Sequence, residues 1–256
     1  MTTAPEALVC DLDGVLYRGN EAIAGAGAAL ATLAGAGVDL VFVTNNSTKT
    51  AAEAAAKISA LTGFPARAAD VVTSAQAAVH LLVPGTPPTL LFGAAGARGP
   101  LEEAGIPVVD DWHVAEAVVA GLDLSLTYES LTRAVMAVGH GARFIATNTD
   151  VTYPTPEGLW PGAGALVAAV EAATGVTPEV AGKPHAAMRN LLGDRLAGRR
   201  VAVVGDRPET DLVLGGAEGW ETILVLTGVT TTPDGVSPTP DHVVASIADV
   251  PALFGL

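Results

Sequence analysis

Short apolar runs along the chain end repeatedly at polar residues. Leu8–Cys10 stops at Asp11-Leu12-Asp13-Gly14, and Val38–Val43 stops at Thr44-Asn45-Asn46. Apolar runs of this length next to turn-forming residues are typical of buried strands. A third such run, Val201–Val204, is followed by glycine and aspartate. In open α/β sheets ligands bind outside the carboxyl ends of the strands, so we expect these polar residues to form a site.

Helical segments alternate with the predicted strands. Ala-rich or amphipathic stretches predict helices near residues 23–36, 49–61, 73–82, 128–139, 161–173 and 186–192. This alternation predicts an α/β fold with a doubly wound parallel sheet. From about Ser74 the order of strands and helices restarts, which predicts a second domain within the chain.

Composition narrows the function classes. The 256 residues are half hydrophobic, enough for one large core or two smaller ones. The net charge is −14, and the basic residues form no cluster beyond Arg199-Arg200, which argues against nucleic-acid and anionic-membrane partners. The single cysteine, Cys10, excludes an intrachain disulfide and a cysteine zinc site.

No segment predicts export or membrane insertion. The first residues lack the basic and apolar regions of a signal peptide. Ala22–Val38 is uncharged, but it is rich in Ala and Gly, whereas a spanning helix needs about 20 strongly apolar residues. We therefore expect a cytoplasmic protein.

Asp11 and Asp13 carry the first candidate chemistry. Side chains alternate along an extended segment, so these two carboxylates point to the same side. Their repulsion would be relieved by a divalent cation, and oxygen-only ligands suit Mg²⁺. A polar strand end followed by a turn explains the same residues equally well at this point.

The other polar segments also have two interpretations. Lys183, between Gly182 and Pro184, is either a functional cation in a fixed loop or a solvated lysine. Asp211 is either a site residue or an acid stabilised at a helix start. Arg207 contacts substrate or pairs with Glu209, and the sequence leaves both open.

Taken together, four motifs resemble the haloacid dehalogenase (HAD) superfamily. They read DLDGV, VTNNS, GKP and GDRPETD, and they occur in the family order. ATNTD at 146–150 and PGAGALVAAVE at 161–171 resemble subclass IIA, the phosphatases related to NagD, 4-nitrophenylphosphatases and phosphoglycolate phosphatases. The resemblance implies a HAD-like (Rossmannoid) core at 1–73 and 179–256. An α/β cap domain of the type that defines this subclass would be inserted at 74–178.

The resemblance also implies catalytic roles. Asp11 would be the nucleophile, and Asp13 would protonate the leaving group and then activate water. The Thr44 hydroxyl and the Asn45 backbone amide would hold phosphoryl oxygens, while Lys183 would neutralise their charge. An acid at position 13 fits phosphatases and mutases and argues against a dehalogenase.

A metal site and specificity residues follow from the same resemblance. Mg²⁺ would bind the Asp11 carboxylate, the Asp13 carbonyl oxygen and the Asp206 carboxylate. Asp211 would orient Lys183 or a metal-bound water. The candidate substrate-specificity residues are Asn46, Asn148 and Asp150; for the last two, a turn after a strand is the alternative.

The sequence thus predicts a Mg-dependent phosphatase that hydrolyses small phosphorylated metabolites through an aspartyl-phosphate. The family suggests glycerol 3-phosphate, 2-phosphoglycolate, a nucleotide monophosphate or pyridoxal phosphate as substrate, and possible association into a homodimer through the cap. The alternatives are a phosphotransferase or phosphomutase using the same site, and a non-enzymatic protein that binds phosphorylated metabolites.

Overall fold

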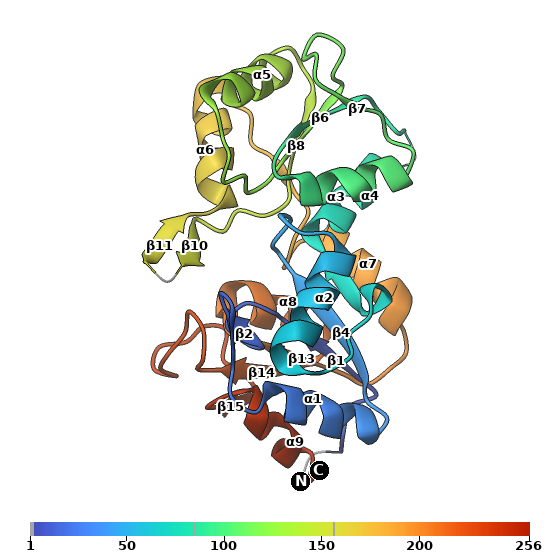
Figure 1. The fold of residues 1–256 in the computed structure, drawn as a ribbon, viewed down its shortest axis with the longest axis vertical. Coiled ribbons are helices and arrows are strands. Elements are labelled where there is room, and N and C mark those ends of the chain that lie inside the picture. Colours follow the sequence, from blue (N-terminus) through green and yellow to red (C-terminus); the bar gives the residue numbers. More distant parts are fainter. Residues whose placement is uncertain (1–2, 84, 156) are drawn as a thin grey trace. The chain divides into compact units, whose positions relative to one another are not determined.

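The computed structural model describes residues 3–83, 85–155 and 157–256, and its contacts divide the chain into two compact units. Unit 1 comprises Met1–Thr44, Ala51–Val72 and Leu192–Leu256, and unit 2 comprises Asn45–Thr50 and Thr73–Leu191. Residues 45–50, residue 73 and residues 179–191 therefore group with unit 2, whereas the family resemblance implied that they belong to the core. Each unit contains its own sheet (Figure 1).

Unit 1 is built on a six-stranded sheet. Its strands, in spatial order, are β15 (His242–Val244), β14 (Glu221–Val225), β13 (Val201–Gly205), β1 (Ala7–Cys10), β4 (Asp39–Thr44) and β5 (Val71–Thr73). Pairing is parallel from β15 through β4. The central strand β1 is buried along its whole length, as an apolar strand covered on both faces should be.

Helices and one hairpin complete unit 1. They are the hairpin β2 (Tyr17–Arg18) with β3 (Glu21–Ala22), the helices α1 (Ala26–Gly35), α2 (Ala51–Thr62), α8 (Val213–Glu218) and α9 (Val250–Leu253), the 3₁₀ turns η1 (Ala68–Asp70) and η4 (Ile247–Asp249), and the π-helical turn η3 (Pro208–Leu212). Helix α7 (Ala186–Leu196) begins in unit 2 and ends in unit 1.

Unit 2 has a five-stranded parallel sheet. Its spatial order is β12 (Glu179–Val180), β9 (Arg143–Ala146), β8 (Ala117–Ala120), β6 (Thr89–Phe92) and β7 (Val108–Val109). The accompanying elements are α3 (Ser74–Leu82), η2 (Ala95–Ala97), α4 (Arg98–Glu103), α5 (Tyr128–Gly139), α6 (Ala163–Thr174) and the hairpin β10 (Thr152–Thr155) with β11 (Gly158–Pro161).

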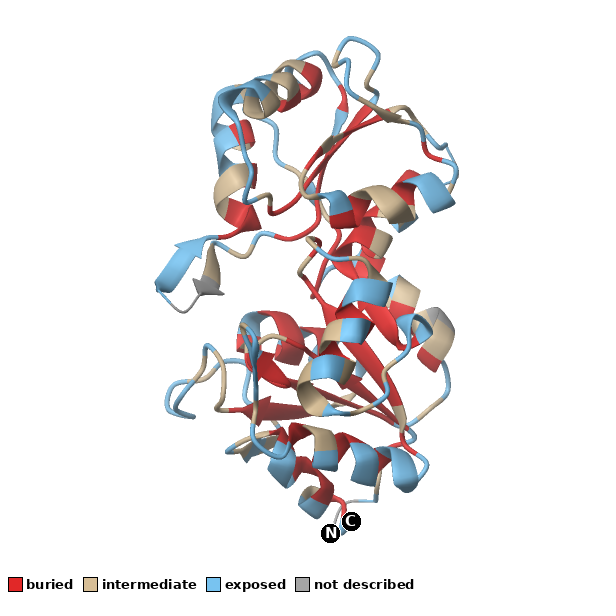
Figure 2. Ribbon diagram, in the orientation of Figure 1, coloured by how far each residue is buried: buried red, intermediate tan, exposed pale blue. Residues whose placement is uncertain are grey.

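Burial follows the hydrophobic pattern in both units. Figure 2 shows the central strands largely buried, while helices such as α1 and α5 are buried along one side. Leu30 and Leu33 of α1 are fully buried with Leu8 and Phe42 in one cluster. A separate cluster, which includes Phe144, fills unit 2. The predicted α/β class with parallel sheets is therefore confirmed.

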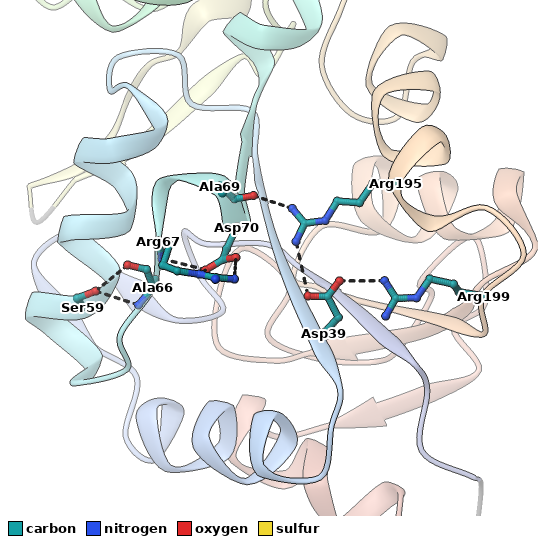
Figure 3. Close-up of polar contacts among 8 residues, drawn as sticks. All are labelled: Asp39, Ser59, Ala66, Arg67, Ala69, Asp70, Arg195 and Arg199. Atoms are coloured by element: carbon teal, nitrogen blue, oxygen red, sulfur yellow. Dashed lines mark hydrogen bonds and ion pairs between the residues drawn. The ribbon is translucent and has the colours of Figure 1, made fainter.

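Ion pairs connect the end of α7 and the residues just after it to the sheet of unit 1 (Figure 3). Arg199 Nη1 lies 2.9 Å from Asp39 Oδ2, and Arg195 Nη2 lies 3.6 Å from Asp39 Oδ1. Arg195 Nη1 also donates a 2.8 Å hydrogen bond to the carbonyl oxygen of Ala69. One helix end is thereby tied to β4 and to η1.

The nearby pair of Arg67 and Asp70 makes stability depend on pH. Two guanidinium nitrogens of Arg67 donate hydrogen bonds of 2.9 and 2.7 Å to the Asp70 carboxylate (Figure 3), and this bonding lowers the pKa of Asp70 below 3.8. A depressed folded-state pKa stabilises the protein above the unfolded value, and that stability is lost as pH falls through the folded pKa. We expect Asp70→Asn to lower the melting temperature at neutral pH and to have little effect once Asp70 is protonated.

Thermal unfolding of Asp70→Asn at a series of pH values checks this expectation. Asp234→Asn, in an exposed loop, is the matched control and should follow the wild type throughout. A deficit in the Asp70 variant that stays constant down to the most acidic pH would contradict the electrostatic explanation.

Candidate active site

Three buried carboxylates meet at the carboxyl ends of the strands in unit 1. Oxygen atoms of Asp11, Asp206 and Asp211 all lie within 4.8 Å of one another. Asp11 directly follows β1, Asp206 follows the adjacent strand β13, and Asp211 belongs to η3. Because these two strands are parallel, their ends bring residues far apart in sequence to one edge of the sheet.

The donor set of this cluster fits magnesium. Asp206 and Asp211 are each only 1% exposed, and Asp11 is 9% exposed. Buried charges are normally paired or bound to metal, because taking a carboxylate out of water is costly. Hard oxygen ligands are the ones that Mg²⁺ prefers. These residues could therefore hold one divalent ion.

The chain packs tightly around Asp206. The backbone N–H of Val229 donates a 2.6 Å hydrogen bond to Asp206 Oδ2. A Cβ atom on Gly14 would lie 2.5 Å from the same oxygen, and one on Gly228 would lie 1.8 Å from it. Gly14 also has φ +90°, a conformation that other residues rarely adopt. Both glycines are thus needed to let the backbone approach this carboxylate.

Asp211 is fixed at the start of the helical segment after β13. The Arg207 N–H donates a 3.2 Å hydrogen bond to Asp211 Oδ2, and the Asp211 N–H donates a 2.9 Å bond to the Arg207 carbonyl. A Cβ atom on Gly205 would lie 2.2 Å from Asp211. The Asp211 carboxylate therefore both accepts a hydrogen bond from the local backbone and joins the acidic cluster.

Asp13 has a different environment from the cluster. The only group of three or more clustered ligand residues among the described residues is formed by Asp11, Asp206 and Asp211, so the Asp13 carboxylate is not part of it. Asp13 Oδ1 lies 4.0 Å from Lys57 Nζ, and its side chain is 29% exposed. Lys57 also lies over the ring of Tyr17, 3.8 Å from its centroid. A solvent-accessible acid is suited to proton exchange with substrate and water.

The remaining phosphate-binding candidates are divided between the two units. Thr44 is the last residue of β4 and is 4% exposed, in unit 1. Asn45 and Lys183 belong to unit 2, where they contact each other. Asn45 Oδ1 accepts a 2.8 Å hydrogen bond from the Lys183 N–H, and Asn45 Nδ2 donates a 3.2 Å bond to the Lys183 carbonyl.

The three specificity candidates also lie in unit 2. Asn148 Nδ2 donates a 2.7 Å hydrogen bond to the Asn45 carbonyl, and Asn148 Oδ1 accepts one of 3.0 Å from the Asp150 N–H. Asp150 Oδ2 lies 3.5 Å from Asn45 Nδ2. Asn46 Oδ1 accepts hydrogen bonds from both the N–H and the hydroxyl of Thr48. The structure thus joins Asn148 and Asp150 to Asn45, while Asn46 stabilises a local turn.

Sequence reasoning missed several residues that shape these groups. Gly228 and Val229 follow β14 and could have been found, because Thr227-Gly228 repeats the polar ending of the other strands. Lys57 and Ser74 gave no such signal. Both lie within helices, and their contacts with Asp13 and Asn45 depend on tertiary structure.

Comparison with known protein families identifies the relationship. A model described as haloacid dehalogenase-like hydrolase matches residues 8–107, and a second HAD-hydrolase-like model matches residues 180–250. The chain belongs to the haloacid dehalogenase-like hydrolase family. Its four motifs, its parallel core sheet and its cap with a separate sheet are those of a HAD-like hydrolase.

Curated relatives and solved structures cover nearly the whole chain. It is 40% identical to an acid sugar phosphatase of Staphylococcus saprophyticus over 230 residues, which are 88% of each protein. A 4-nitrophenylphosphatase from Thermotoga maritima is 33% identical with a TM-score of 0.90, and the match covers 98% of both chains. A glycerol phosphate phosphatase from Mycobacterium tuberculosis in complex with magnesium is 34% identical with a TM-score of 0.89; the match covers 96% of this chain and 77% of that one.

The subclass resemblance drawn from the motifs is confirmed by these nitrophenylphosphatase and acid sugar phosphatase relatives. Among the described residues, no helix is both long enough and apolar enough to cross a bilayer.

Proposed function

We propose that the protein is a magnesium-dependent phosphomonoesterase that acts on small phosphorylated sugars or glycerol phosphate. The buried cluster of Asp11, Asp206 and Asp211 at the carboxyl edge of a parallel sheet carries this proposal. The cluster occurs in a chain whose similar proteins described above are phosphatases. The proposed substrates are those of the similar acid sugar phosphatase and glycerol phosphate phosphatase.

In the proposed reaction Asp11 attacks the phosphorus atom of the substrate. The bond from phosphorus to the ester oxygen breaks as an aspartyl-phosphate forms, and Asp13 donates a proton to the departing alkoxide. Asp13 then takes a proton from water, which attacks the same phosphorus and releases inorganic phosphate and the Asp11 carboxylate. The exposure of Asp13 supports its exchange of protons with solvent.

The other residues bind the transferred group. Thr44, Asn45 and Lys183 are proposed to hold the phosphoryl oxygens and balance their charge, because phosphoryl transfer depends largely on positioning and electrostatics. The Asp11 and Asp206 carboxylates and the Asp13 carbonyl would hold Mg²⁺, with Asp211 beside them. When bound, the ion offsets carboxylate repulsion and supplies positive charge for the phosphoryl oxygens.

We propose that one part of the chain carries out catalysis and the other selects the substrate. Residues 1–73 and 179–256 would form the catalytic core, and residues 74–178 would form the cap that selects the leaving group. The two separate sheets support a division into two parts, with β12 (Glu179–Val180) in the sheet of unit 2. We also propose a cytoplasmic location, supported by the acidic composition, which favours solubility.

Release of inorganic phosphate from a panel of compounds tests the function. The panel contains sugar phosphates, glycerol 3-phosphate, 2-phosphoglycolate, a nucleotide monophosphate, pyridoxal phosphate and an aryl phosphate, each with Mg²⁺ and with EDTA. We expect release from sugar phosphates or glycerol 3-phosphate and its loss with EDTA. Transfer of phosphate to a second hydroxyl without release would indicate a phosphotransferase, and binding without turnover would indicate a binding protein.

Asp150 is proposed to influence which substrate is preferred. Its side chain is partly exposed, and its N–H is anchored on Asn148, which places it on a fixed turn after β9. We expect Asp150→Ala to change the ratio of kcat/KM between glycerol 3-phosphate and sugar phosphates about tenfold, equivalent to about 1.4 kcal/mol, because specificity is a difference in transition-state binding. Activity on the aryl phosphate should change less.

Asp123→Ala provides the control for this comparison, since Asp123 is half-buried in a turn after β8 in the same unit. If Asp150→Ala lowers kcat/KM for all substrates by one common factor, Asp150 does not determine specificity.

A further inference from the structure

The side chain of Asn45 holds both main-chain polar groups of Lys183. Asn45 Oδ1 accepts the Lys183 N–H at 2.8 Å, and Asn45 Nδ2 donates to the Lys183 carbonyl at 3.2 Å. Only 8% of Asn45 and 4% of Lys183 is exposed. A carboxamide that pairs with both groups of one residue constrains the position and the orientation of that residue's Cα. The base of the Lys183 side chain is therefore fixed by Asn45.

The loop that carries Lys183 is shaped for this contact. A Cβ atom on Gly182 would lie 2.5 Å from Asn45 Oδ1 and 2.5 Å from the carbonyl oxygen of Thr147. Such distances are far below a van der Waals contact, so no other residue fits there without displacing the loop or Asn45. Glycine at position 182 is thus required for the approach between these segments.

Asn45 is itself held in place by two buried side chains. Its carbonyl accepts hydrogen bonds from Ser74 Oγ at 2.6 Å and from Asn148 Nδ2 at 2.7 Å. Ser74 is fully buried, and Asn148 is 4% exposed. Buried donors and acceptors arranged in this way form a rigid network, because breaking any one bond leaves a polar group unsatisfied. The Asn45 carboxamide therefore presents a fixed surface to the Lys183 loop.

We propose that the Asn45 side chain is a positioning residue that aligns Lys183 for phosphoryl binding, and that Asn148 supports it by anchoring the Asn45 backbone. This role is additional to phosphate binding by the Asn45 amide, and it rests on the proposed function of Lys183. It also gives Asn148 a structural task besides contact with substrate. Misplacement of a catalytic group by about 1 Å costs about 100-fold in rate, so the effect should be measurable.

A double-mutant cycle tests whether Asn45 acts through Lys183. We would compare the wild type, Asn45→Ala, Lys183→Met and the double variant on the aryl phosphate, measuring kcat and KM separately. The inhibition constant for inorganic phosphate, measured for the same four proteins, gives a second double-mutant cycle that reports phosphate binding to the free enzyme. We expect Asn45→Ala alone to lower kcat/KM about 10- to 100-fold, mainly through kcat. In the Lys183→Met background it should lower kcat/KM less than about threefold, because coupled residues are non-additive.

The possible outcomes separate the inference from the proposed function. Equal losses from Asn45→Ala in both backgrounds would overturn the positioning role, because the effect would then not pass through Lys183. Full activity and unchanged phosphate inhibition in Lys183→Met would instead overturn the role of Lys183 in the proposed function. If turnover by Lys183→Met is too slow to measure, the double-mutant cycle on phosphate inhibition tests the positioning role instead.

Folding is checked by circular dichroism and thermal unfolding of every variant. Asn190→Ala is the matched control, since it makes the same chemical change at an exposed position of α7. It should leave kcat, KM and phosphate inhibition unchanged. If Asn45→Ala unfolds, Asn148→Ala replaces it in the cycle, because it removes a single anchor from the Asn45 carbonyl. We expect a smaller loss that again disappears in the Lys183→Met background, and the same loss in both backgrounds would overturn the proposal.

Discussion

Replacing Asp11 by asparagine is expected to abolish phosphate release while the fold is retained. The amide has nearly the shape of the carboxylate but cannot form the aspartyl-phosphate. Removing a nucleophile typically costs on the order of 10⁴-fold or more in kcat. The same change takes one negative charge out of the buried cluster with Asp206 and Asp211, so the metal-free variant should melt at the same temperature as the wild type or higher. Turnover of the aryl phosphate and thermal unfolding in EDTA measure both effects.

A covalent intermediate distinguishes the nucleophilic role from a purely electrostatic one. Wild-type protein quenched in acid during turnover should carry phosphate on the peptide that contains Asp11, and Asp11→Asn should not. Asp234→Asn, at an exposed site in the same unit, should behave as the wild type. Substantial residual turnover in Asp11→Asn, with phosphate attached elsewhere, would show that Asp11 is not the nucleophile.

The parts of the fold that the sequence predicted are those determined by local pattern. β1 and β13 are continuous apolar runs, so their ends at Asp11 and Asp206 could be located before the fold was known. The helix at Tyr128–Gly139 has a regular apolar stripe and a capping residue, Thr127, and its expected limits match the observed ones. In these segments local propensity and tertiary environment favour the same structure.

The elements that the sequence did not reveal are very short or contain prolines. β7 and β12 have two residues each, too few to show any periodicity. The segment before α6 contains prolines, which disfavour strands, yet it forms the hairpin β10–β11. Proline is tolerated there because both strands of an isolated hairpin are edge strands and need not donate hydrogen bonds on their outer sides.

In the candidate site, too, the contacts that depend on tertiary structure could not be inferred from the sequence. The strand ends and the family resemblance implied that Asp11, Asp206 and Asp211 lie near one another, and the structure brings their oxygens within 4.8 Å. The contacts of Asn45 with Lys183 could not be inferred, because they join residues 138 positions apart through the backbone of Lys183. Every residue except proline has the same main-chain N–H and carbonyl groups, so a side chain that bonds to them does not require a particular residue type at position 183. Such supporting contacts emerge only from the folded chain.

Replacing Asp206 by asparagine is expected to have the largest effect on the metal. Asp206 is 1% exposed, and Val229 and two close glycines fix its carboxylate, so it cannot move to compensate for a lost charge. Asparagine keeps an oxygen that can accept the Val229 N–H but removes one anionic ligand. We expect the magnesium dissociation constant to rise about 100-fold or more, since even residues that merely support metal ligands contribute 10- to 100-fold.

Calorimetric titration with Mg²⁺ measures this change directly, and the shift of the melting temperature by Mg²⁺ measures it independently of activity. Asp13→Asn is the informative control. It removes a carboxylate that is not part of the cluster but leaves the main-chain carbonyl, so it should lose turnover and keep magnesium affinity. If instead Asp13→Asn weakens magnesium and Asp206→Asn does not, the ion is held by the Asp13 carboxylate and the assignment of ligands to the buried cluster is wrong.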